Sequence, residues 1–415
     1  MIDVLSLAVR RLLDLLVPPR LGTGFRWLLA ASWANNLGDG IALAAGPLLV
    51  ASLTADPFLI SLAALLTWAP PLVFGLWAGV LSDRLHRRTI VLAGNGIRLA
   101  VLVALVGMLA TDTLTVAGAL VALGLLATAE VFADNAAATL VPMLVPRADL
   151  GVANARMQTG LLTLNQLAGP PIGAAIFAAG VVLPFAAEAV LLAAGALLLS
   201  RITLPPHGRE PGAPASVWRD IAQGFRWTAR HAAVRTLVLT ILIFNVTYGA
   251  AWSVLVLYAR ERLGLGAVGF GLLTTASAAG GLVGTGLYGV ITRRLSLGAV
   301  MRIGLIIETL THLALALARS AWVAVPVFVV FGAHAFVWGT TSMTVRQRAV
   351  PRELQGRVNS VNMIAVYGGL VVGSAIGGAL ATRSGVTAPF WFAFAGSALF
   401  LVLLWRQLNR IAHDD

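Results

Sequence analysis

Cysteine and lysine are both absent from this 415-residue chain, and charged residues of any kind are scarce. Without cysteine, the chain can form neither a disulfide framework nor a thiolate metal site. Charged residues make up only 11% of the sequence and hydrophobic residues 59%, compared with an apolar share of ~45–50% in soluble domains. This excess of apolar residues predicts a chain that is solvated by lipid.

Twelve long apolar stretches follow one another almost to the end of the chain, and short turns separate most of them. A helix needs about 20 mostly apolar residues to cross a bilayer. Barrel strands are excluded because they alternate over about ten residues. The sequence therefore predicts an all-α polytopic membrane protein with 12 transmembrane helices. The expected spans are 25–53, 57–82, 89–110, 113–140, 150–179, 181–202, 236–260, 267–292, 297–318, 321–345, 353–383 and 387–409.

All 29 basic residues are arginines, and most of them gather in alternate turns between the spans. If the N-terminus is cytoplasmic, these turns lie on the cytoplasmic side, and the opposite side holds only Arg260, Arg262, Arg319 and Arg383. Positive residues accumulate on the cytoplasmic side of membrane proteins. The pattern predicts a multi-pass protein of the cell membrane, inner or plasma, with both termini cytoplasmic. The net charge of +12 thus reports topology, and we expect no nucleic-acid partner.

The longest polar interruption, residues 203–235, divides the spans into six and six. Its first part is rich in Pro and Gly and is typical of a linker, while its second part predicts an amphipathic helix. Residues 1–22 predict another amphipathic helix on the membrane surface, because charges interrupt the apolar run and exclude a cleavable signal. The expected domains are an interfacial segment (1–22), a six-helix bundle (23–202), a cytoplasmic linker (203–235), a second six-helix bundle (236–409) and a tail (410–415).

Two polar turns of the first half recur in the second half. The turn GVLSDRL (79–85) corresponds to GVITRRL (289–295), and VPRADLGVAN (145–154) corresponds to VPRELQGRVN (350–359). Gly173 then matches Gly378 at the same offset as the second pair. Because the matches lie in polar turns, a shared apolar composition does not explain them, and they indicate a duplication. We therefore expect two pseudo-symmetric six-helix bundles.

The charged turn after the second span resembles the signature Gly-x-x-x-Asp-Arg-x-Gly-Arg-Arg of the major facilitator superfamily of secondary transporters. The residues that fit are Gly79, Asp83, Arg84, Arg87 and Arg88. His86 stands where the second glycine is usual. The stretches VPRELQGRVNS and NNLGDGIALAAGPLL resemble the branch that contains macrolide efflux proteins and the enterobactin exporter. The resemblance implies the major facilitator fold and alternating access to a central site, and we expect a monomer with no cofactor and no enzymatic activity.

The same resemblance implies a latch at the cytoplasmic face that forms and breaks as the two bundles close and open. Asp83 would dock against the start of the helix over 353–383, and Arg84 and Arg88 would brace neighbouring helix ends. Alternatively, the arginines only anchor the topology, which is the interpretation that we favour for Arg87. The expected gate residues are Gly79, Asp83, Arg84, Arg87, Arg88, Gly356 and Arg357.

Ionisable side chains at bilayer depth cost at least ~2.5 kcal/mol on insertion scales, so each one is a candidate functional group. Glu130 and Asp134 share a helix face, and Asp39 lies on the first span. Two carboxylates in a poorly solvated place are not expected to be ionised together, so one of them should carry a proton. We expect Asp39, Glu130 and Asp134 to include a proton-coupling site, with Arg98 as a counter-charge. Alternatively, Arg98 forms a static pair with Asp39 or Glu130 that holds the helices together.

Two further acids are expected to have structural roles. Glu188 lies near the outer end of its span, which favours a snorkelling or packing acid. Glu308 shares a span with His312 one turn further on, which favours a local pair over a ligand site.

Polar and aromatic side chains at helical spacing predict the rest of the cavity. The expected cavity residues are Asn36, Asn245, Tyr248, Trp252, His334 and Trp338. Aromatic rings beside carboxylates suit a bulky, partly apolar, cationic solute through stacking and cation–π contact. Alternatively, each ring is a packing residue. No second ligand stands at metal-binding spacing beside His334, so we expect no metal site.

The fifth span contains AGPPIGAA (168–175), in which Gly169, Pro170 and Gly173 resemble the Gly-Pro motif of drug antiporters. The prolines free backbone carbonyls and bend the helix, and the glycines admit close packing. The alternative is an ordinary kink.

Together these features favour a secondary active transporter that exports a small amphipathic compound, such as a drug, antibiotic, siderophore or secondary metabolite. The proton is the candidate coupling ion. An importer of a nutrient or siderophore on the same fold is the alternative, because the sequence does not encode the direction. The sequence lacks the phosphate-binding Walker pattern, which argues against an ATP-driven pump.

Overall fold

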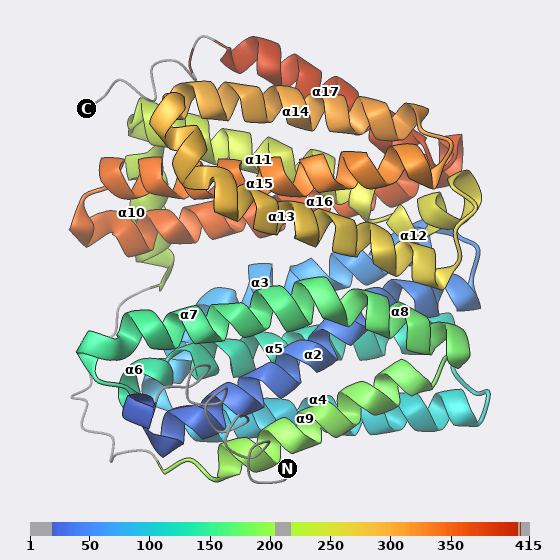
Figure 1. Cartoon of the computed structure of the whole chain (residues 1–415), viewed down its shortest axis with the longest axis vertical. Helices are drawn as coiled ribbons and strands as arrows, with labels where there is room; N and C mark the ends of the chain where they lie inside the picture. The colour runs from blue at the N-terminus through green and yellow to red at the C-terminus, as the bar shows by residue number, and fades with distance from the viewer. Residues whose placement is uncertain (1–18, 204–216, 406, 408–415) are drawn as a thin grey trace, which may run out of the picture.

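The computed structural model describes residues 19–203, 217–405 and 407, and all regular elements within them are helices (Figure 1). Most of the expected interfacial segment (1–22), the first part of the linker and the tail (410–415) lie outside the described residues. Within the described chain, eleven helical segments are long and apolar enough to cross a membrane, and a twelfth apolar helix has 17 residues. The predicted all-helical membrane fold is confirmed.

Two groups of helices lie side by side along the long axis of the molecule (Figure 1). The first bundle contains α2 (Gly22–Leu53), α3 (Pro57–Arg84), α4 (Arg87–Ala110), α5 (Val116–Ala138), α6 (Val141–Leu144), α7 (Leu150–Gly160), α8 (Gly169–Ala179) and α9 (Leu183–Ser200). The second bundle contains α11 (Ala232–Trp252), α12 (Leu255–Leu257), α13 (Ala267–Arg294), α14 (Leu297–Leu317), α15 (Ala321–Ala349), α16 (Gln355–Ser384) and α17 (Ala388–Leu404). The amphipathic helix expected in the linker is α10 (Val217–Arg230), and it packs on α16.

Corresponding residues end and begin helices in the two bundles, as the repeated turns predict. α3 ends at Arg84 and α13 at Arg294, and in each case the N–H of the following leucine donates to the carbonyl four residues earlier (3.0 and 2.9 Å). The other repeated turn forms a 3-10 turn in both bundles (Arg147–Asp149 and Arg352–Leu354), after which α7 and α16 begin. The pseudo-symmetry is therefore visible at the level of single helix ends.

The two ends of the molecule differ in arginine content. One end, on the left in Figure 1, carries α6 and α10, and we call it the Arg-rich face. The other end, which we call the opposite face, carries α12 and the turns after α2 and α4. The arginines that define the Arg-rich face are Arg87, Arg88, Arg147, Arg293 and Arg294.

Among the described residues, the bundles share a buried apolar cluster towards the opposite face. There Leu48 and Ile60 of the first bundle belong to the same buried cluster as Val254 and Tyr258 of the second. The Arg260 guanidinium also donates to the Ala51 carbonyl across the bundles, over 3.4 Å. The buried apolar clusters described near the Arg-rich face each contain residues of one bundle alone. The described chain is therefore closed at the opposite face and separated at the Arg-rich face.

The Gly-Pro motif lies where α8 crosses α2. A Cβ on Gly169 would lie 2.5 Å from the Gly40 Cα, and a Cβ on Gly173 would overlap the Ile41 carbonyl oxygen. Ahead of the motif the helix is π-helical over Leu161–Ala168. The prolines that follow lack N–H donors, which relaxes the α-helical bonding of the preceding turn. The glycines thus allow backbone contact between two helices.

We predict that Gly173→Ala destabilises the protein, because the added methyl group would overlap the α2 backbone. Overpacking of this kind should lower the free energy of unfolding by about 1–3 kcal/mol. Thermal unfolding in detergent, followed by tryptophan fluorescence, measures the effect. The control is Gly107→Ala on α4, where a Cβ would meet nothing within 4 Å. Equal unfolding midpoints for the two variants would contradict the helix contact.

Candidate functional site

A cavity of about 1150 Å³ lies between the two bundles. Its lining begins at Ile60 and Phe270 near the closed opposite face and continues to Leu76 and Asn359 near the Arg-rich face. Pockets for drug-sized ligands measure roughly 300–1,000 Å³. The cavity therefore has room for a bulky solute and opens where the apolar cores of the bundles are separate.

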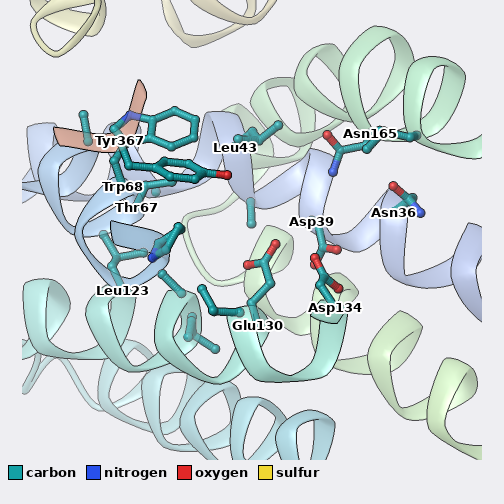
Figure 2. Close-up of a pocket in the computed structure, with 18 of the residues that line it drawn as sticks. Asn36, Asp39, Leu43, Thr67, Trp68, Leu123, Glu130, Asp134, Asn165 and Tyr367 are labelled. Carbon is teal, nitrogen blue, oxygen red and sulfur yellow. The ribbon is translucent and has the colours of Figure 1, made fainter. Parts of the chain in front are cut away.

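Three carboxylates project into the cavity from the first bundle. Figure 2 shows Asp39 of α2 and Glu130 and Asp134 of α5 pointing towards one another on one side of the pocket. Their positions follow from helical periodicity, since Glu130 and Asp134 are one turn apart on the same face. Neither Glu130 nor Asp134 has a hydrogen bond or ion pair to the part of the chain that the structure describes. Both side chains are therefore available to a solute or a proton.

Arg98 of α4 lies behind these acids and is only 2% exposed. Its guanidinium forms an ion pair with Asp39 and lies 3.4 Å from Glu188 Oε1 on α9. The pair with Asp39, which we considered as an alternative, is therefore present. Glu188 is as buried as Arg98, so it belongs to this site and is not a snorkelling acid. Its contact with Arg98 was missed because position along a span does not reveal the neighbouring helix.

The charges of this site do not balance. Four carboxylates, those of Asp39, Glu130, Asp134 and Glu188, line the cavity with one guanidinium, that of Arg98. The cluster is therefore anionic whenever more than one of the acids is ionised. An anionic cavity attracts cations, and the attraction is strong where water is scarce.

Aromatic rings form the other wall of the cavity, and both bundles contribute to it. Trp68 of α3 stacks on Tyr367 of α16, with ring centroids 6.4 Å apart, away from Asp39 and Asp134 (Figure 2). Tyr248 and Trp252 of α11 stack at 4.4 Å and also line the cavity. The sequence reasoning missed Trp68 and Tyr367, although both are aromatic residues in the middle of polar-poor spans.

Of the six expected cavity residues, Asn36, Tyr248 and Trp252 line the cavity, whereas the other three do not. Asn245 donates to the Ile241 carbonyl (2.7 Å), His334 contacts Glu308 (3.0 Å) and Trp338 stacks on Phe244 (6.0 Å). The expectation that these three face the solute is thereby corrected. Helical spacing shows that residues share a face, but it does not show towards which neighbour the helix turns that face.

The expected gate residues are dispersed around the open Arg-rich face. Arg88 donates to the Ser200 carbonyl at the end of α9, and Arg87 donates to the Ser82 carbonyl (3.4 Å). Arg357 Nε lies 2.7 Å from Asp220 Oδ1 on α10. The side chains of Asp83 and Arg84 lie outside the described residues. A Cβ on Gly79 or Gly356 would meet nothing within 4 Å, so neither glycine makes a close backbone contact here.

Comparisons with known proteins agree with this architecture. Residues 17–414 match the model of a family described as transmembrane secretion effector. The multidrug efflux pump Tap of Mycolicibacterium fortuitum is 28% identical over 383 residues, which are 88% of this chain and 90% of that protein. A variant of the nucleoside transporter NupG has a TM-score of 0.75 at 11% identity, over 94% of this chain and 100% of its own. An inward-facing bacterial homologue of the iron transporter ferroportin has a TM-score of 0.73 at 15% identity, over 94% and 98%.

We predict that Arg98→Met destabilises the protein by about 3–5 kcal/mol at neutral pH, because it leaves the buried Glu188 and the partly buried Asp39 without their cation. Acidification should neutralise the carboxylate charge that Arg98 no longer compensates, so the deficit relative to the wild type should shrink as the pH falls. Thermal unfolding between pH 5 and 8 measures both effects. Arg293→Met, at an exposed position, is the control. A deficit that does not change with pH would show that packing, not charge, explains the loss.

Proposed function

We propose that this chain exports a small amphipathic cation by alternating access. The premise is that the chain belongs to the transmembrane secretion effector family of the major facilitator superfamily. The fold and the family support a membrane transporter rather than an enzyme. The observation that carries the proposal is the anionic, aromatic-lined cavity, which is open at one face and closed at the other.

The chemistry of the cavity supports a cationic solute. The carboxylates of Glu130 and Asp134 offer charge on one wall, and the stacked rings of Trp68 and Tyr367 offer an apolar surface on the other (Figure 2). A cation over an aromatic face gains about 0.5–2 kcal/mol. A solute with a positive group and an apolar body would meet both walls at once. Drugs, antibiotics and secondary metabolites include many such compounds.

The same carboxylates support coupling to protons, with Asp39, Glu130 and Asp134 as the coupling site and Arg98 as its counter-charge. Neighbouring carboxylates in a poorly solvated place are not ionised together, so one proton and one solute cation compete for the same acids. Protonation from outside would release the cation, and loss of the proton to the inside would restore its site. Competition of this kind is sufficient for antiport.

The sidedness of the chain supports export. If the Arg-rich face is cytoplasmic, as the positive-inside rule indicates, the open cavity takes its solute from the cytoplasm. The similarity to an efflux pump points the same way. One chain supplies both walls of the cavity, so a monomer in the cell membrane suffices. The gate at the Arg-rich face, with Asp83 docking near Gly356 and Arg357, would form only when this face closes.

We predict that everted vesicles with the wild-type protein take up ethidium when their interior is acidified, and that Asp39→Asn and Glu130→Gln each abolish this pH-driven uptake. Neutral side chains cannot exchange the coupling proton. Quenching of ethidium fluorescence on accumulation gives the rate. The control is Glu261→Gln, at a half-exposed carboxylate on the opposite face. Unchanged coupling in both cavity variants would refute the coupling site, and greater ethidium accumulation in intact cells would indicate an importer.

We further predict that Trp68→Ala and Tyr367→Ala raise the KM for ethidium about 2- to 30-fold, the equivalent of about 0.5–2 kcal/mol of lost cation–π contact. The maximal rate should change less, because the carboxylates remain. Concentration-dependent uptake in the same vesicles separates the two parameters. Trp322→Ala, at a ring that is 88% exposed, is the matched control. A KM shift as large in the control would remove the aromatic wall from the proposed site.

A further inference from the structure

A second cluster of ionisable groups lies in the middle of the second bundle, outside the cavity lining. Glu308 and His312 of α14 are one turn apart, and His334 of α15 faces them. The two carboxylate oxygens of Glu308 lie 2.9 Å from His312 Nε2 and 3.0 Å from His334 Nε2. All three side chains are buried, with residue exposures of 1, 0 and 6%. One carboxylate thus bridges two imidazoles at bilayer depth.

The number of protons in this cluster is constrained by its geometry. If both imidazoles are neutral and donate from Nε2, Glu308 is ionised and the cluster carries one net negative charge. One additional proton makes the cluster neutral, either as an imidazolium beside a carboxylate or as a protonated Glu308. A buried group with uncompensated charge is costly, so the neutral state is favoured. The neutral state of the buried cluster therefore requires this additional proton.

No other charged group of the described residues pairs with the cluster. Among the described residues, Glu308 makes ion contacts with the two histidines alone. Tyr248 is the neighbouring titratable group on α11, and Arg302, further back on α14, lies over the Trp405 ring. α17 has no titratable residue, and those of α13 are Tyr288, Arg293 and Arg294 towards its Arg-rich end. The extra proton is therefore what balances the charge.

Aromatic side chains separate the cluster from the cavity. Trp252 lines the cavity, and its ring meets the His312 ring edge-on with centroids 6.1 Å apart. Phe331 stands between Tyr248 and His334, with centroids 5.7 and 5.8 Å away. The Nδ1 atoms of both histidines are buried and have no hydrogen-bond partner among the described residues. The cluster thus holds two unsatisfied ring nitrogens, and its His312 ring lies directly behind a side chain that lines the cavity.

We propose that Glu308, His312 and His334 form a proton-binding site in the second bundle, separate from the cavity acids, that exchanges one proton with cavity water during each transport cycle. The proposal rests on the proposed function, in which protons drive transport. Trp252 covers the site in this structure, so exchange requires movement of α11 relative to α14. The proton comes from water and returns to water, and no other bond forms or breaks. Each bundle would then hold one protonation site, and the solute would bind between the two sites.

The direct test is nitrogen NMR of the full chain in nanodiscs with ¹⁵N-labelled histidine. Because both Nε2 atoms contact the carboxylate, the extra proton places a hydrogen on one Nδ1 in either neutral form, whereas the deprotonated cluster has two bare Nδ1 atoms. We expect a protonated Nδ1 at pH 7 that is lost at higher pH. His312→Gln and His334→Gln assign the signals among the six histidines. If both Nδ1 atoms are unprotonated from pH 5 to 9, the proposal is wrong and the cluster is a static hydrogen-bonded contact between helices.

Variants separate this site from the cavity acids. Glu308→Gln keeps the shape and the hydrogen bonds but cannot release the proton, so the histidine signals should no longer change with pH. In proteoliposomes this variant should move about one proton fewer per ethidium, and Asp39→Asn should leave the histidine titration intact. His86→Gln, near the Arg-rich face, is the control. An unchanged proton-to-ethidium ratio in Glu308→Gln would refute the coupling role. Failure of the wild-type protein to transport ethidium would refute the proposed function. The NMR result would still decide whether the cluster binds a proton.

Discussion

The ion contacts of Arg98 are the constraint on which the first bundle depends. A guanidinium at bilayer depth is tolerated only with anionic partners, and Arg98 finds them in Asp39 on α2 and Glu188 on α9. These contacts connect three helices at one point. The acids of α5 lie near a guanidinium that is already paired with other acids. More acids surround this single cation than it can neutralise, so the cavity is anionic whenever more than one of them is ionised.

The two bundles divide the work of recognition unequally. The first bundle supplies the described cavity carboxylates, whereas the aromatic wall needs Trp68 from one bundle and Tyr367 from the other. A solute bound between the carboxylates and the rings, as we propose, would be sensitive to the distance between the bundles. Charge alone would bind it in either conformation, but the ring stack exists only while α3 and α16 keep their present separation.

The fold could be predicted from the sequence because the signals that determine it are local. Apolar length predicts the spans, and the repeated polar turns end α3 and α13 at corresponding arginines. The cavity acids could be predicted because an ionisable side chain is costly at bilayer depth and is therefore a candidate functional group. His334, Glu188 and the Trp68–Tyr367 stack did not follow, because each depends on which neighbour a helix face meets. The rotation of each packed helix decides which neighbour its face contacts. A single sequence shows which residues share a face but not which helix that face meets.

The π-helical stretch Leu161–Ala168 has a mechanical consequence for the fifth span. An α-helix turns by about 100° per residue, so exchange of one wide turn for a regular turn would rotate everything beyond it by that amount with little change in length. Asn165 and Gln166 line the cavity within this stretch, and α8 beyond it packs against α13. A change of helix type within this stretch would therefore rotate α8 relative to α13, between the cavity and the closed end of the molecule.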